Sequence, residues 1–252
     1  IMIDEIISFF TNNKIGLIIG LIVILYFLLS FRGFISTVNA KVDINRELIR
    51  RDINNGPIIA EFKNVFSPQE CDEIIAVGKK LVQPSLVGFD FGQDEKVRNS
   101  SHAWLAREEH PSIARASKLV SELTNLPVEN QEKFQLVRYQ KGQKYNHHFD
   151  ACNPSAGDYK ECIENSKHHG ARKFTFLIYL NDVFYGGETD FPKVNMKIQP
   201  RKGSAVLFRN LIGNTRESDP LSLHAGLPPT QNEEKWIINV WTRDTLYDLY
   251  SS

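Results

Sequence analysis

The second half of the chain is a series of short apolar segments, and this series constrains the fold more than any other feature. Five segments rich in β-branched and aromatic residues predict strands: 134–139, 144–150, 173–180, 205–208 and 235–243. Glycines such as Gly186-Gly187 separate them, which indicates turns. Two helical segments precede these strands, at 67–81 and 111–123, and a further strand is predicted before them at 58–62. This order predicts an α+β, mainly β fold: a double-stranded β-helix, or jelly roll, with the supporting N-terminal helices packed outside it.

Residue types that bind metals occur at strand spacing in His148-x-Asp150. In a strand, alternate side chains share a face, so these two side chains would point the same way and His147 would point the other way, in a structural role. A histidine from a distant strand would complete a three-ligand set, and His224 is the best candidate. Two imidazoles and one carboxylate on one side of a metal form the facial triad of non-haem Fe(II) oxygenases.

The segment 235–243 presents two chemically different faces. Alternation places on one face Lys235, Ile237, Asn239, Trp241 and Arg243, whereas the other face is more uniformly apolar. Lysine, asparagine and arginine side chains have no place in a dry core, so this face predicts the wall of a polar cavity. A solvated sheet face is the alternative.

Composition limits the class of protein. The chain has 252 residues with 30 acidic and 30 basic side chains, so its zero net charge gives no reason to expect nucleic-acid binding. Three cysteines are too few for a disulfide framework. Cys152 and Cys162 flank a polar loop and could pair in an oxidising compartment, which the sequence leaves open.

An uncharged apolar run at 15–31 predicts a single transmembrane anchor, because a helix apolar on every side cannot lie at the edge of a soluble domain. Lys14 alone precedes this run and five basic residues follow it closely, which favours a cytoplasmic C-terminal domain by the positive-inside rule. The sequon Asn99-Ser100-Ser101 favours the lumen instead. The expected parts are an N-terminal segment with the anchor (1–32), a stalk (33–55) and a folded domain (56–252).

Six blocks follow one another in the globular part: Tyr139 with Gly142-Gln143-x-Tyr145-x-x-His148-x-Asp150, Tyr179-Leu180-Asn181, Gly186-Gly187-Glu188-Thr189-Asp190-Phe191-Pro192, Pro200-x-Lys202-Gly203-Ser204-Ala205, His224-Ala225-Gly226, and Lys235-Trp236 with Asn239-x-Trp241. Because of these blocks, residues 57–244 resemble the prolyl 4-hydroxylases, members of the Fe(II)/2-oxoglutarate dioxygenase superfamily. A bare His-x-Asp occurs by chance in many proteins, whereas this order of blocks is specific. The resemblance implies that 56–252 is a catalytic domain.

The resemblance also implies roles for individual residues. The Fe(II) ligands would be His148, Asp150 and His224. Lys235 would act in catalysis by pairing with the distal carboxylate of 2-oxoglutarate. Three further residues would bind this cosubstrate or line its pocket: Tyr139, Thr189 and Trp241. Three residues would face the peptide substrate: Tyr145, Arg172 and Arg243. Arg243 stands where relatives often carry histidine. The segment 152–170 is predicted to be a loop with a length of its own, and no role is carried over to it.

The implied reaction is hydroxylation of peptidyl proline to 4-hydroxyproline with O₂ and 2-oxoglutarate, releasing succinate and CO₂. L-Ascorbate is the further cofactor implied, and the partner is a protein or peptide that contains proline. Anchored relatives chiefly have a lumenal catalytic domain of the endoplasmic-reticulum type, which conflicts with the charge count. Three alternatives are hydroxylation of another peptidyl residue, a catalytically silent membrane-tethered peptide-binding module, and a zinc hydrolase with the same three ligands.

Overall fold

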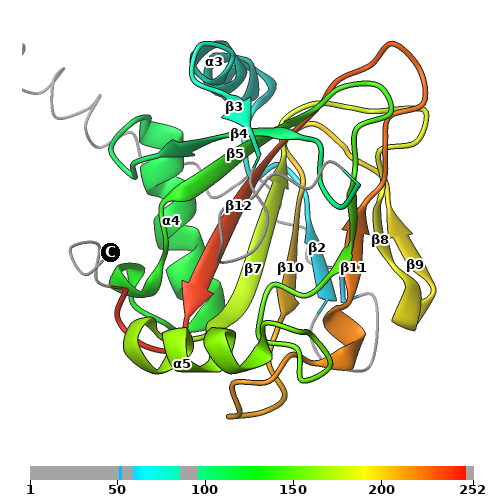
Figure 1. The fold of residues 1–252 in the computed structure, drawn as a ribbon. Coiled ribbons are helices and arrows are strands. Elements are labelled where there is room, and N and C mark those ends of the chain that lie inside the picture. The colour runs from blue at the N-terminus through cyan, green and yellow to red at the C-terminus, as the bar shows by residue number, and fades with distance from the viewer. Residues whose placement is uncertain (1–50, 53–58, 86–95, 248–252) are drawn as a thin grey trace, which may run out of the picture. The chain divides into compact units, whose positions relative to one another are not determined.

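The structure is a computed structural model, and it describes residues 51–52, 59–85 and 96–247. Two antiparallel sheets face each other (Figure 1). The larger has the order β1 (Arg51–Asp52), β2 (Ile59–Phe62), β10 (Ala205–Arg209), β7 (Arg172–Tyr179), β12 (Lys235–Arg243), β5 (Phe134–Tyr139), β4 (Ser101–Leu105) and β3 (Gln83–Pro84). The smaller has the order β6 (Tyr145–His148), β11 (His224–Gly226), β8 (Thr189–Phe191) and β9 (Met196–Ile198). This arrangement confirms a mainly β fold of antiparallel sheets with few helices, as in jelly-roll oxygenases.

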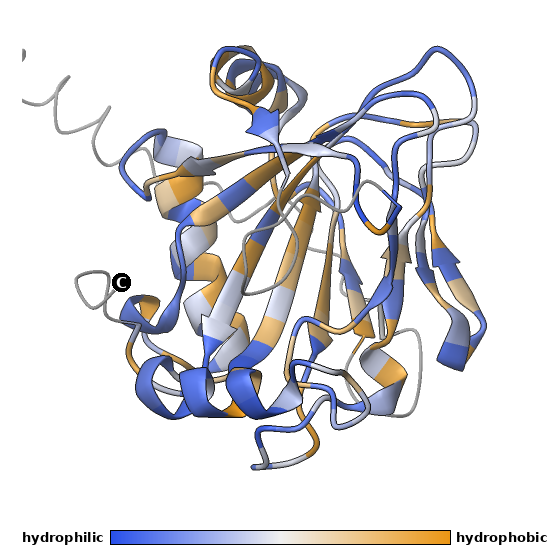
Figure 2. Cartoon of the chain, viewed as in Figure 1, coloured by the Kyte–Doolittle hydropathy of each residue, from blue (hydrophilic) through white to orange (hydrophobic). Residues whose placement is uncertain are grey.

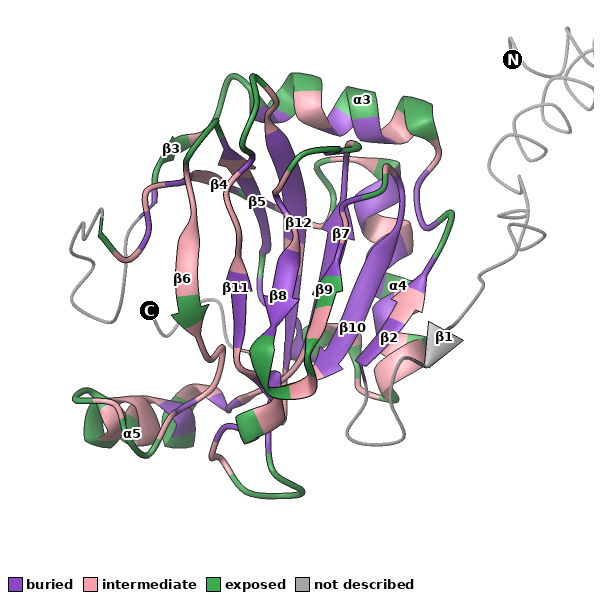
Figure 3. Cartoon of the chain, turned by 90° about the vertical axis from the view of Figure 1, so that its right-hand side faces the viewer, coloured by how far each residue is buried: buried purple, intermediate pink, exposed green. Residues whose placement is uncertain are grey.

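Strand alternation divides the apolar side chains of the large sheet between two cores. On β12, Ile238 faces a core shared with the helices, whereas Ile237 faces a second core between the two sheets. Phe191 of β8 contributes to this second core from the small sheet. Figure 3 shows the central strands of the large sheet as largely buried. Apolar residues pack on both faces of this sheet, which explains the continuous apolar sequences of its strands.

Two helices cover the outer face of the large sheet, α3 (Pro68–Gly78) and α4 (Pro111–Thr124). Ser67 caps α3 in a capping box with Glu70, whose side chain accepts a hydrogen bond from the Ser67 backbone at 2.7 Å. Apolar residues of both helices, including Ile74 and Ile113, are fully buried against the sheet. The predicted helices are present, and α3 ends earlier than predicted. The other helices of the described residues are α5 (Tyr159–His169) and three 3-10 turns, η1 (Val128–Asn130), η2 (Pro192–Val194) and η3 (Pro220–Ser222).

Two predictions about local structure were wrong. The strand predicted at 144–150 ends at His148, so Asp150 follows it in a bend. The segment 152–170 was interpreted as a loop but contains α5, and a disulfide joins Cys152 to Cys162. Figure 2 shows why the helix gave no sequence signal, since α5 is almost entirely hydrophilic and has no apolar stripe.

The predicted anchor at 15–31 lies outside the described residues. Across the ranges that the structure describes, no helix is long and apolar enough to span a bilayer. Most of the predicted stalk is likewise outside them, but its residues Arg51–Asp52 form β1, which pairs with β2.

Candidate active site

Three potential metal ligands meet between the two sheets. His148 is the last residue of β6, and His224 is the first residue of β11 and lies directly opposite it in the pairing. Asp150 lies two residues beyond β6, with carboxylate oxygens 3.6 Å from Nε2 of His148 and 3.7 Å from Nε2 of His224. The three ligand atoms lie within 4.8 Å of one another. The structure therefore brings the predicted set together, although a bend rather than strand alternation orients Asp150.

Backbone carbonyls orient both imidazoles. Nδ1 of His148 donates a hydrogen bond to the carbonyl oxygen of Asn146 at 2.7 Å, and Nδ1 of His224 donates to that of Ser222 at 2.9 Å. Because a carbonyl oxygen can only accept, each Nδ1 carries the proton and each Nε2 keeps its lone pair. Both Nε2 atoms face Asp150, which is the arrangement that ligation of one metal ion requires.

Asp150 is held in its ionised form and fixed orientation. Burial alone would raise the pKa of its carboxyl, but the neighbouring imidazoles and the Arg172 guanidinium outweigh burial and lower that pKa below the usual range. Oδ2 accepts a hydrogen bond from Oγ1 of Thr175 at 2.6 Å, and Asn210 donates to the same hydroxyl at 2.8 Å. No motif in the sequence marks Thr175 or Asn210, since a threonine inside a strand and an asparagine directly after one are both ordinary.

His224 is buried, and desolvation lowers its pKa to about 4, so its imidazole is neutral near pH 7. Two imidazole Nε2 donors and one carboxylate that converge from one side suit Fe(II) with open coordination positions. Among the residues that the structure describes, this is the one group of three or more histidine, cysteine or acidic side chains with metal-binding geometry.

Lys235 provides a second, independent feature of the same pocket. Its side chain is only 1% exposed, and its Nζ has no hydrogen-bond partner within 51–52, 59–85 and 96–247. Burial lowers the pKa of this ammonium to about 7, against the opposing effect of Glu188. A buried, unpaired ammonium is costly unless an anion joins it. The pocket therefore fits a carboxylate ligand that reaches from the metal ligands to Lys235.

The other residues predicted to bind this ligand also line the pocket: Tyr139, Thr189 and Trp241. Thr189 accepts a hydrogen bond from the Tyr179 hydroxyl at 2.8 Å, while Nε1 of Trp241 is buried without a hydrogen-bond partner in the described part of the chain. Gly226 lets β11 approach Tyr139, because a Cβ at this position would lie 3.2 Å from the tyrosine hydroxyl. The face predicted for β12 does line a polar cavity at Lys235, Asn239 and Trp241, whereas Arg243 at its end lines the wider groove beside it.

A wider groove of about 890 Å³ opens beside the pocket and contains the three residues predicted to face a substrate. Tyr145 stacks on the His148 ring with centroids 3.6 Å apart. Arg172 lies 3.7 Å above the Trp241 ring and makes a bidentate ion pair with the buried Glu132. Arg243 also pairs with Glu132, at 2.8 Å. Glu132 was missed in the sequence because it lies at the edge of a strand without any motif.

Comparison with known proteins decides the family. A profile of the 2OG-Fe(II) oxygenase superfamily matches residues 134–243. A protein of Acanthamoeba polyphaga mimivirus that bears a prolyl 4-hydroxylase name is 36% identical over 208 residues, which are 82% of this chain and 81% of the viral protein. The chain belongs to the prolyl 4-hydroxylase family. Prolyl 4-hydroxylase 13 of Arabidopsis thaliana is 31% identical over 210 residues, 76% of this chain and 73% of the plant protein.

A solved structure of the family gives the same result. The viral collagen prolyl hydroxylase vCPH from Paramecium Bursaria Chlorella virus-1, determined as a 2OG complex, is 31% identical with a TM-score of 0.61. It covers 77% of this chain, and the alignment spans 99% of the viral chain. As a member of this family, the chain is a dioxygenase that uses Fe(II), 2-oxoglutarate and O₂. The zinc hydrolase interpretation is therefore wrong.

Proposed function

We propose that this prolyl 4-hydroxylase-family enzyme hydroxylates C4 of proline in a peptide, with His148, Asp150 and His224 as the ligands of Fe(II). The observation that carries the proposal is the unpaired Nζ of Lys235 in the pocket that those ligands line. In this proposal the Lys235 ammonium is the counter-charge for the distal carboxylate of 2-oxoglutarate. The overall reaction converts peptidyl proline, 2-oxoglutarate and O₂ into 4-hydroxyproline, succinate and CO₂.

Bound Fe(II) and 2-oxoglutarate supply the oxidising chemistry, and the protein supplies position and exclusion of water. Asp150 contributes a fixed carboxylate, because Thr175 holds one of its oxygens. Apolar residues of the inner core, including Leu177 and Ile237, line the pocket beside Lys235 and lower the local dielectric. A low dielectric strengthens the pairing of the ammonium with a carboxylate. Tyr139, Thr189 and Trp241 complete the cosubstrate pocket in this proposal.

The wider groove is the proposed binding site for the peptide. It is lined by Tyr145 and Arg172 beside the metal ligands and reaches past Trp104, whose ring is 45% exposed. Aromatic and guanidinium surfaces of this kind suit the apolar ring and the backbone carbonyls of a proline-rich segment. L-Ascorbate as a further cofactor stays a prediction that rests on the family resemblance.

We also propose that residues 15–31 anchor the enzyme in a membrane with a lumenal catalytic domain. The disulfide between Cys152 and Cys162 supports a lumenal position, because such bonds persist in oxidising compartments. The basic residues that follow the apolar run favour the cytoplasm instead. Protease protection of the full chain in microsomes tests the orientation, since only a lumenal domain survives until detergent is added.

Mass spectrometry of a proline-rich peptide library after incubation with Fe(II), 2-oxoglutarate, ascorbate and O₂ tests the reaction. We expect a gain of one oxygen on proline together with succinate. His148→Ala should abolish both products, whereas His110→Ala is the matched control, since His110 pairs with Glu73 and lines neither the pocket nor the groove. Oxygen on another residue type would identify a different hydroxylase, and peptide binding without succinate would identify a silent binding module.

A further inference from the structure

The helix α5 is unusual because its own packing cannot hold it in place. Ser166 is its one buried residue, and its other side chains are exposed or partly exposed. Helices shorter than about 12–15 residues are marginal in water without a packed apolar face. The 11 residues of α5 therefore need other interactions to keep them helical and in position.

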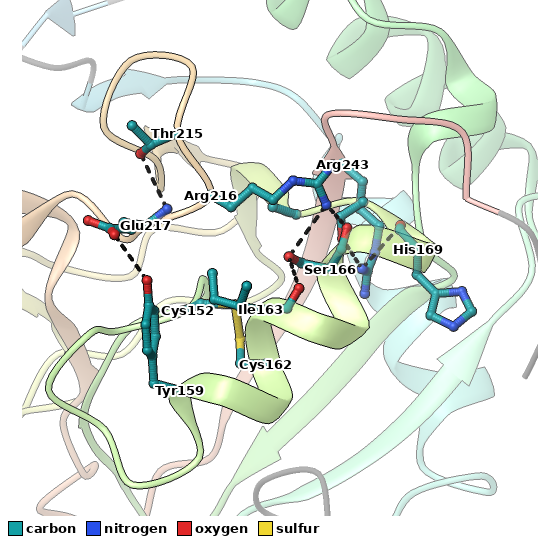
Figure 4. The surroundings of a disulfide bond; sticks show 12 residues. Cys152, Tyr159, Cys162, Ile163, Ser166, His169, Thr215, Arg216, Glu217 and Arg243 are labelled. Carbon is teal, nitrogen blue, oxygen red and sulfur yellow. Dashed lines mark hydrogen bonds between the residues drawn. A yellow bond between two sulfur atoms is a disulfide. The ribbon is translucent and has the colours of Figure 1, made fainter.

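The first half of α5 is held to the loop that follows β10. The disulfide between Cys152 and Cys162 joins the helix to the end of the metal-ligand segment (Figure 4). The backbone N–H of Ser218 donates to the carbonyl of Cys152 at 2.8 Å. The Tyr159 hydroxyl donates to Glu217 at 3.0 Å. One covalent and two polar contacts thus fix this half of the helix.

Two arginines hold the second half. Arg216 donates to the carbonyl oxygen of Ser166. Nη1 of Arg243 donates to the carbonyl oxygens of Gly170 at 2.6 Å and His169 at 3.3 Å. The last carbonyls of a helix carry partial negative charge and lack partners within the helix, so a guanidinium at this position stabilises the helix end.

Arg243 also joins α5 to the centre of the groove. Its Nε donates to Glu132 at 2.8 Å, and Glu132 in turn orients Arg172 through two bonds of 2.6 Å and 2.8 Å. Only 13% of the Arg243 side chain is exposed. Nε and Nη1 of Arg243 thus both donate to groups of the protein itself. We therefore assign Arg243 the role of positioning these groups rather than contacting the proline.

One edge of α5 lines the same groove as the metal ligands. Asn165 and His169 from the helix, and Asp158 directly before it, line the groove that Tyr145 and Arg172 also line. These three side chains offer an amide, an imidazole and a carboxylate, all of which form hydrogen bonds. A peptide in the groove would therefore meet a polar wall along α5.

We propose that α5 is a specificity-determining wall that contacts polar residues flanking the reacting proline, and that Arg243 and the Cys152–Cys162 disulfide are the groups that position it. The inference rests on the proposed function, because it assumes that the groove binds a peptide. It reassigns Arg243, which the sequence suggested as a substrate contact. The peptide class that it predicts carries hydrogen-bonding side chains next to proline rather than apolar ones.

The test compares tether variants with matched controls. In the Cys152→Ser/Cys162→Ser double variant and in Arg243→Met, amide hydrogen exchange across α5 should become at least about tenfold faster. The KM for the best peptide of the library should rise about tenfold, because binding must then order the wall. The KM for 2-oxoglutarate should stay within about twofold. Arg243→Lys should recover part of the peptide affinity, since one ammonium cannot serve Glu132 and the helix end together.

Cys71→Ala and Arg115→Met are the controls, since Cys71 is a buried free cysteine and Arg115 pairs with Glu70 outside the groove. If the double variant does not fold, Tyr159→Phe removes one tether with the disulfide intact. Unchanged exchange in α5, or faster exchange with an unchanged peptide KM, would overturn the proposal. A wild-type enzyme that hydroxylates no library peptide would contradict the proposed function instead, and the exchange measurement would still show whether the tethers hold α5.

Discussion

At the scale of single residues, Lys235 carries a charge that the ligand-free protein stabilises poorly. Burial lowers its pKa from 10.5 to about 7, so folding opposes the charged form. The destabilisation grows as the pH falls from 10.5 to about 7 and is constant below this range. Each pKa unit corresponds to about 1.4 kcal/mol. The ammonium is therefore retained at a cost in stability, which a bound carboxylate relieves.

Replacing Lys235 by methionine should separate stability from function. Lys235→Met keeps the apolar stem and removes the unpaired charge, so the free energy of unfolding of the ligand-free protein should rise by about 1–4 kcal/mol at pH 7. Binding of 2-oxoglutarate should weaken by about 30-fold or more. Urea unfolding and anaerobic titration measure the two effects. A Lys235→Met protein that is less stable and still binds 2-oxoglutarate would contradict the assigned role of this lysine.

The same lysine predicts a dependence on pH. Above pH 7 the ammonium of the ligand-free protein loses its proton, while the 2-oxoglutarate carboxylate requires it, so binding must take up a proton. Affinity should fall up to about tenfold per pH unit between pH 7.5 and 9. Calorimetry in buffers of different ionisation enthalpy measures the proton uptake. Lys235→Arg should bind weakly without this dependence, because a guanidinium stays protonated.

At the scale of elements, β12 separates two tasks by alternation. Ile238 is fully buried in the core that the helices share with the large sheet. The next residue, Asn239, is partly buried and lines the pocket. The strand thus carries stability on one face and the cosubstrate site on the other, and the spacing of its sequence already indicated this division.

These neighbours form a matched pair for mutation. Ile238→Ala should lower the free energy of unfolding by about 2–5 kcal/mol, because it leaves a cavity in the core, and should leave 2-oxoglutarate affinity close to wild type. Asn239→Ala should change stability by less than about 1 kcal/mol and should weaken the cosubstrate. Chemical denaturation and ligand titration of both variants test the division. A loss of cosubstrate binding in Ile238→Ala alone would show that the two faces are coupled.

Strands of four or more residues that carry apolar side chains were largely predictable from the sequence, whereas the three-residue strands were not. The bounds of β5 and β12 were predicted correctly because each combines length with apolar residues. The strands β8 and β11 have three residues each, so they exist only through pairing with their neighbours. Helix α5 was missed because a disulfide and arginines hold it, and no periodic pattern records such contacts.

The site was predictable to the extent that its residues form motifs. The three ligands, Lys235 and the lining aromatics follow recognisable blocks, and the structure brings them to one pocket. Glu132 and Thr175 act through contacts with residues 40 and 25 positions away, respectively. Such long-range partners are set by tertiary structure, so a single sequence cannot indicate them.

At the scale of the whole catalytic unit, the site lies apart from the principal core. The larger core lies between the helices and one face of the large sheet, whereas the ligands lie on the other side of that sheet. We therefore expect the fold to persist without the metal, and the bound metal to add to its stability.

Metal removal should confirm this separation. With a chelator the circular dichroism should stay native, whereas Fe(II) at about 100 times its Kd should add about 2.7 kcal/mol to the free energy of unfolding under anaerobic conditions. His224→Ala should reduce this increment strongly, and His147→Ala should keep it. Unfolding on chelation would show instead that the metal is structural.

The backbone contacts of the two imidazoles have a consequence for evolution. The acceptors that select their tautomers are the main-chain carbonyls of residues 146 and 222. Every amino acid provides such a carbonyl, so these positions can drift in sequence without harming the histidines. The orientation of the Asp150 carboxylate depends on the hydroxyl of Thr175, which few other amino acids supply. In divergent descendants of this enzyme, the residue at position 150 should therefore change before the two histidines, and the reaction should be lost or altered with it.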